Sequence, residues 1–164
     1  MFLLPRQTLY LRLSARQLAI CHVQSGAQFA DEPVVALSKQ GRPSQIVAIG
    51  HDAVALGDSL QWLLVNPFSH PRTLLADFAL AEKVLAYFIA RVRPRRWWPQ
   101  PFTLILHPQD KLDGGLTQIE LRALHELGLA AGASKVQIWT GATLSASDLL
   151  SATFPGALGE LHPV

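Results

Sequence analysis

Apolar and polar positions alternate at the start of the chain in the way that β-strands require. Residues 8–14 carry a leucine at every second position, and residues 17–24 follow as a second strand-like stretch after a two-residue connection. Because side chains of a strand point alternately to the two faces of a sheet, we expect a hairpin here. We also expect strands at 29–38 and 46–49, a short helix at 51–56, and a strand or irregular connection across 58–73.

The second half has the longer period of helices. Between Leu74 and Val92 the apolar residues recur at spacings of four and three, which places them on one helix face, and Pro94 ends the helix. A second helix is expected at 116–130 and a last one at 143–152, with strands at 102–106 and 136–139. Helices and strands that alternate in this way predict right-handed crossovers and parallel strands. The fold class is therefore α/β, with a mixed sheet flanked by helices.

Composition narrows the class of protein. Of 164 residues, 49% are hydrophobic and only 16% charged, with a net charge of +2, which excludes intrinsic disorder. Charged residues usually make up about a quarter of a globular chain, so we expect some apolar surface to meet a partner or a membrane. The single cysteine, Cys21, excludes a disulfide scaffold and a cysteine-based zinc site. No apolar run approaches the ~20 residues of a membrane span, and we expect a cytoplasmic protein.

Motifs of catalysis are missing from the sequence. There is no phosphate-binding loop of the Walker type and no nucleophile elbow. The six histidines are scattered, so we interpret them as surface or hydrogen-bonded residues and expect no metal site. Asp110 and Asp113 flank a glycine loop, but two carboxylates without a third partner more often belong to a solvated loop than to a cation site. We expect no cofactor.

One segment, residues 91–102, has unusual chemistry. It combines four arginines, two adjacent tryptophans and several prolines, which keep it out of a helix or a central strand. Indole rings favour the membrane interface, and arginines are attracted to an anionic leaflet. Two other interpretations are a lid of tryptophans on the core and a nucleic-acid patch, but the patch is short and isolated, so we expect no nucleic-acid partner. The residues that we expect to bind an anionic membrane surface are Arg93, Arg95, Arg96, Trp97 and Trp98.

Five segments resemble the amino-terminal part of MreB, the bacterial actin-like cell-shape protein, in the order of that family. The matching stretches are DEPVVAL (31–37) with NEPSVVAI, VAIGHDA (47–53) with AVGHEAK, LADFALAEKVLAYFI (75–89) with IADFEVTEKMLKYFI, TQIELRA (117–123) with TEVERRA, and LAAGASKV (129–136) with LEAGASKV. The resemblance implies an actin-like, ribonuclease H-like domain with a small inserted subdomain. It places the large subdomain at 1–30 and 74–164 and the small one at 31–73.

The sequence departs from the family where nucleotide is bound. The family begins with a hairpin, Asp-x-Gly-Thr, whose acid serves the magnesium ion and whose backbone meets the phosphates, and here that place holds Arg12, Leu13, Ser14 and Ala15. Glu120 falls where the family keeps the glutamate that positions the attacking water, and we interpret it as vestigial. The chain also ends near the family's crossover into the second large domain. We therefore expect neither nucleotide binding nor catalysis.

The resemblance also bears on partners. In several MreB proteins a hydrophobic loop between the long helix and the next strand enters the membrane, and residues 93–101 occupy that interval; residues 1–4 are a weaker second candidate. We expect a non-catalytic, MreB-like pseudo-ATPase on the inner face of the cell membrane that binds MreB, other cell-shape or envelope proteins, or further copies of itself. Two alternatives stay open: a nucleotide-handling protein completed by a second chain, and an actin-like scaffold domain of another envelope assembly.

Overall fold

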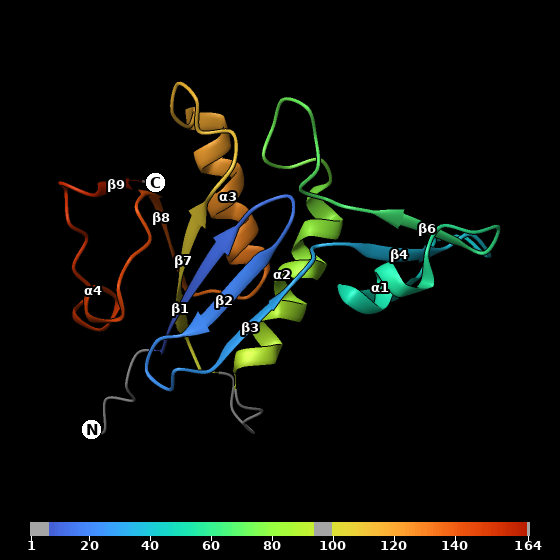
Figure 1. The fold of residues 1–164 in the computed structure, drawn as a ribbon, viewed down its shortest axis with the longest axis horizontal. Coiled ribbons are helices and arrows are strands. Elements are labelled where there is room, and N and C mark those ends of the chain that lie inside the picture. The colour runs from blue at the N-terminus through green and yellow to red at the C-terminus, as the bar shows by residue number, and fades with distance from the viewer. Residues whose placement is uncertain (1–6, 94–99, 164) are drawn as a thin grey trace.

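The computed structural model describes residues 7–93 and 100–163 and contains two sheets (Figure 1). The larger sheet has the strand order β3-β2-β1-β7-β8-β9, and the smaller one the order β5-β4-β6. The strands of the larger sheet are β1 (Gln7–Leu13), β2 (Leu18–His22), β3 (Gln28–Asp31), β7 (Phe102–Pro108), β8 (Lys135–Gly141) and β9 (Gly159–His162).

Strand directions in the larger sheet follow the expected mixture. β1, β2 and β3 pair in antiparallel fashion, whereas β1 pairs with β7, and β7 with β8, in parallel. Parallel neighbours need a crossover connection, and helices α2 (Phe78–Val92) and α3 (Gln118–Ala130) precede β7 and β8 in that role. The prediction of an α/β fold with a mixed sheet is confirmed.

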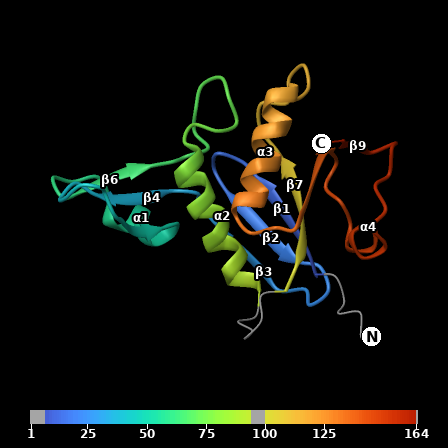
Figure 2. The same ribbon diagram turned by 180° about the vertical axis from the view of Figure 1, so that it is seen from behind.

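Helices α2 and α3 cover one face of the larger sheet, as the view from behind makes clear (Figure 2). On β1 the leucines Leu9, Leu11 and Leu13 point to these helices and are at most 1% exposed. Tyr10 lies on the other face, in a smaller cluster with Trp139 and the segment around helix α4 (Ala146–Ser151). The sheet thus separates two apolar clusters of unequal size.

The long helix α2 begins later than its apolar period predicts. We expected α2 to begin at Leu74, but it begins at Phe78 because the side chain of Asp77 accepts a hydrogen bond from Leu80 N at 2.9 Å. An aspartate in this position satisfies a backbone N–H that the first helical turn leaves free, so it fixes the start of the helix. Leu74 is still buried against the core, which explains why it matched the helical period.

The smaller sheet lies beyond α2 on the side away from α4 (Figure 1). It consists of β4 (Val35–Ser38), β5 (Ile46–Ile49) and β6 (Trp62–Val65), with the short helix α1 (His51–Leu56) packed on it. The prediction of a single strand at 29–38 is wrong. Strand β3 ends at Asp31 in the larger sheet, and β4 begins at Val35 in the smaller sheet. Pro33 lies in this break, and a proline cannot donate to a sheet ladder.

Two differences fall at the end of the chain. Helix α4 has six residues, shorter than the expected 143–152, because Ser145 caps its start and Ala152 takes the left-handed conformation at its end. Strand β9 was not expected at all. Its four residues contain one leucine and no regular alternation, so only its antiparallel pairing with β8 defines it.

Candidate functional site

The turn between β1 and β2 is the first candidate site, because it follows the carboxyl end of β1. This strand is central in the larger sheet and pairs in parallel with β7, and ligands of open α/β sheets bind at the carboxyl ends of strands. Residues 14–17 form the turn, and Ser14 N donates to the carbonyl oxygen of Gln17 at 3.1 Å. The Ser14 hydroxyl donates to the same carbonyl at 2.9 Å. The serine therefore helps to close the turn on itself.

The peptide groups of Ala15 are held by side chains from two distant segments. Its N–H donates to Asp110 Oδ2 at 2.7 Å, and its carbonyl oxygen accepts from Asn66 Nδ2 at 2.6 Å. Asn66 follows the smaller sheet, whereas Asp110 lies in the connection between β7 and α3. The hydrogen-bond donor of the Ala15 peptide is thus already taken by the carboxylate of Asp110.

Arg12 and Glu120 do not meet at this turn. Arg12 lies on β1 with an exposed side chain, on the sheet face opposite α2 and α3. Glu120 lies in the first turn of α3, where its Oε2 accepts from Thr117 N and Thr117 Oγ1, both at 2.9 Å. This reciprocal capping arrangement stabilises the helix start. Within the described residues, no hydrogen bond joins Glu120 to the β1–β2 turn.

A buried hydrogen-bonded chain links β1, β7 and the end of β8. The Tyr10 hydroxyl lies 2.5 Å from His107 Nδ1, and His107 Nε2 lies 3.0 Å from the carbonyl oxygen of Gly141. Because Gly141 O can only accept, His107 carries its proton on Nε2 and Nδ1 accepts from Tyr10. The Tyr10 oxygen in turn accepts from Leu144 N at 3.3 Å.

Burial controls the protonation of this chain. It raises the pKa of Tyr10 and lowers the pKa of His107. The positive charge of Arg12 lowers the pKa of His107 further, whereas the hydrogen bond to Gly141 O raises it. His107 is 1% exposed. Sequence reasoning missed this pair, although the alternation on β1 did place Tyr10 on the face away from the leucines. Nothing local marks His107 as the partner of a residue 97 positions away.

The basic, tryptophan-containing segment is described only at its two ends. Arg93 lies with its guanidinium 4.3 Å from the Phe102 ring centroid and donates from Nε to Gln7 Oε1 at 3.2 Å and from Nη2 to the Gln100 carbonyl. Desolvation lowers the pKa of Arg93. Arg93 thus ties the two ends of the segment to each other and to β1. The other four residues expected to bind a membrane, Arg95, Arg96, Trp97 and Trp98, lie outside the described residues, as do residues 1–6.

The described residues also bear on metal binding and on membrane spanning. Across residues 7–93 and 100–163, no three histidine, cysteine, aspartate or glutamate side chains gather as a metal site would require. Asp110 is engaged with the β1–β2 turn, as described above. In the same two ranges, none of the helices combines the length and apolarity that crossing a bilayer demands.

Comparison with known proteins identifies the family. The family model for MreB/Mbl protein matches residues 7–147. The cell shape-determining protein MreB of Pasteurella multocida is 32% identical over 125 residues, which cover 73% of this chain and 34% of that protein. MreB of Escherichia coli is 30% identical over 121 residues, which cover 71% and 33%. The chain therefore spans about a third of the length of the curated relatives it matches.

Solved structures agree on the fold. The crystal structure of MreB 5 of Spiroplasma citri bound to AMPPNP superposes with a TM-score of 0.66 at 19% identity, over 82% of this chain and 38% of that one. At this identity the likeness concerns the fold, which is that of the actin-like MreB structures. Together, the family match and the sequence relatives show that this chain belongs to the MreB/Mbl family.

Proposed function

We propose that this chain is a non-catalytic, MreB-like protein that binds MreB filaments or their cell-shape complex at the inner face of the cell membrane. The observation that carries the proposal is the hydrogen bond from Ala15 N to Asp110. A turn whose N–H is already held by a carboxylate has lost a donor for phosphate, and the carboxylate itself repels a phosphate group.

The charge at Arg12 supports the same conclusion. Magnesium that accompanies a nucleotide is bound through carboxylates and phosphate oxygens, and Arg12 stands where the family has its acid. A guanidinium cannot ligate a cation and repels it. Glu120 is hydrogen-bonded to the cap of its own helix, which gives it a structural role without a nucleotide.

Exposed apolar side chains support a docking role. Six large hydrophobic residues between 37% and 97% exposed gather on the smaller sheet, its helix and its loop: Ile46, Val47, Val54, Leu56, Leu60 and Leu63. Apolar surface of this kind commonly marks a protein–protein contact. In this proposal the smaller sheet binds the filament.

Membrane association rests on the tryptophan segment. Tryptophans favour the interface, and each basic residue near an anionic leaflet contributes about 1 kcal/mol. Because Arg93 is held by Phe102, Gln7 and Gln100, we assign it the positioning of the segment and assign the lipid contact to Arg95, Arg96, Trp97 and Trp98. A single shallow anchor binds weakly, so assembly on a filament would strengthen attachment through multivalency.

Co-sedimentation with polymerised full-length MreB tests the docking role. We expect the wild-type chain to pellet with filaments, and Leu60→Asp to pellet several-fold less, because it places a charge on the most exposed of the six apolar side chains, which is 97% exposed. Leu150→Asp is the matched control, since Leu150 is 64% exposed on α4, away from the smaller sheet. A wild-type chain that stays in the supernatant, or two variants that behave alike, would contradict the proposal.

A further inference from the structure

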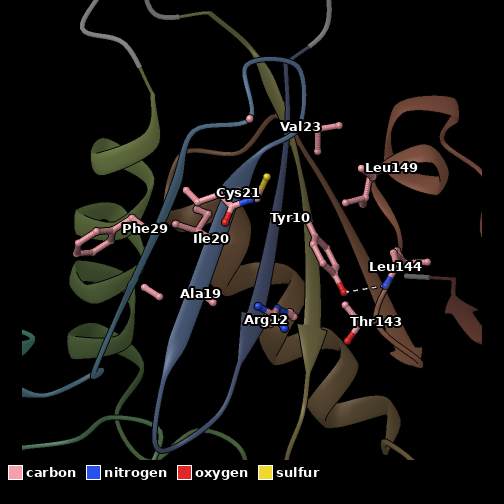
Figure 3. Close-up of a pocket in the computed structure, with 14 residues that line it drawn as sticks. Tyr10, Arg12, Ala19, Ile20, Cys21, Val23, Phe29, Thr143, Leu144 and Leu149 are labelled. Atoms are coloured by element: carbon pink, nitrogen blue, oxygen red, sulfur yellow. Dashed lines mark hydrogen bonds between the residues drawn. The ribbon is translucent and has the colours of Figure 1, made fainter.

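The face of the larger sheet opposite α2 and α3 carries a cavity of about 430 Å³ (Figure 3). The strand register explains why it exists. Arg12 stands opposite Ala19, which stands opposite Ala30, and Tyr10 stands opposite Cys21, which stands opposite Gln28. The small side chains of Ala19, Cys21 and Ala30 therefore form a low floor beside the two large side chains of β1.

The wall of the cavity is apolar. Leu144 and Leu149 face the floor from the segment that contains α4, and both are buried among apolar neighbours. In Figure 3 these leucines lie across the opening from Cys21 and Arg12. Cavities of roughly 300–1,000 Å³ with apolar linings and few polar groups are typical of small-molecule sites.

The charge that lines the cavity is positive. Arg12 is its only charged lining residue among those described, and no carboxylate of the described chain lies within ion-pair distance of it. The Tyr10 hydroxyl is engaged with His107 and Leu144, so it is not free to hold a ligand. Cys21 is partly buried, and desolvation raises the pKa of its thiol, so the cysteine contributes apolar surface rather than a thiolate.

We propose that this cavity binds a small amphipathic anion, with an apolar body against Leu144 and Leu149 and a single carboxylate on the guanidinium of Arg12. Arginine binds carboxylates through paired charge-assisted hydrogen bonds, which suits a head group of this kind. The site is separate from the β1–β2 turn peptide and from the smaller sheet, and it does not depend on the proposed function.

Titration with decanoate tests the site, with decanol as the uncharged analogue. We expect decanoate to bind about tenfold more tightly than decanol, measured by calorimetry, and to shift the amide resonances of Cys21 and Leu149 in a ¹H–¹⁵N spectrum. Arg12→Gln should weaken decanoate about tenfold and leave decanol unchanged. Arg16→Gln is the matched control, since Arg16 is exposed at the neighbouring turn and does not line the cavity.

Three outcomes would overturn the site. Decanol that binds as tightly as decanoate would show that Arg12 selects no anion, and the wild-type comparison gives this answer even if a variant fails to fold. Resonance shifts confined to the smaller sheet would place the ligand elsewhere. Decanoate that produces neither heat nor shifts would show that the cavity is not a ligand site.

Discussion

Replacing Trp97 and Trp98 with alanine is expected to abolish flotation of the protein with vesicles of anionic phospholipid. The two indole rings supply the apolar part of the proposed anchor, and the arginines that remain attract the surface without inserting into it. Affinity from charge alone falls steeply with salt, because the Debye length shrinks to about 8 Å at physiological ionic strength. The measurement is vesicle flotation at physiological salt, comparing wild type with the double variant.

Two controls make this result specific. Trp62→Ala removes a tryptophan from β6 in the smaller sheet, so it should float as the wild type does. Vesicles of zwitterionic lipid should retain less wild-type protein than anionic ones. Wild-type protein that never floats, or a double variant that floats unchanged, would rule out the segment as a membrane anchor.

Tyr10→Phe is expected to lower the free energy of unfolding by about 1–3 kcal/mol. The substitution keeps the ring but removes the oxygen that lies between His107 Nδ1 and Leu144 N, leaving a buried acceptor and a donor without their partner. Denaturant unfolding followed by circular dichroism measures the change. Tyr87→Phe is the matched control: its hydroxyl accepts from Arg91 at the surface, so its loss should cost less than about 0.5 kcal/mol.

The same network predicts how stability depends on pH. Burial lowers the pKa of His107 in the folded protein, so the unfolded chain binds a proton more readily than the folded one. This contribution to stability is complete above the ordinary histidine pKa of about 6.5 and is lost as pH falls from there toward the folded pKa. His107→Gln should therefore show a shallower loss of stability below about pH 6.5. An equal slope in both proteins would contradict the burial argument.

The periodicity of apolar residues predicted the long helix α2 and the first strand β1. The 3.6-residue repeat of α2 and the alternation of leucines on β1 each predicted the element and most of its core-facing side chains. Two side chains differ from the pattern: Phe78 is 41% exposed, and Tyr10 is buried on the opposite face of the sheet. The break between β3 and β4 was missed because both halves are strand-like, and only their membership of different sheets separates them. Strand β9 was missed because its pairing with β8, not its own sequence, makes it a strand.

The candidate site could also be predicted only in part from the sequence. The replacement of the family's acid by Arg12, and the loss of glycine and threonine at Ser14 and Ala15, can be seen in the sequence alone. That Asp110 and Asn66 would close over Ala15 cannot, since they lie 95 and 51 positions away. The cavity beside Arg12 likewise depends on the register of three strands, which places small residues of β2 and β3 side by side.

We propose that Asp110 closes the β1–β2 turn against nucleotide. The most direct test follows the Ala15 amide resonance while Mg-ATP is added to roughly 5 mM, above the ~1 μM–1 mM range of typical enzyme–substrate constants. The account predicts that the Ala15 resonance stays in place throughout the titration. A saturable, magnesium-dependent shift of that resonance would contradict it.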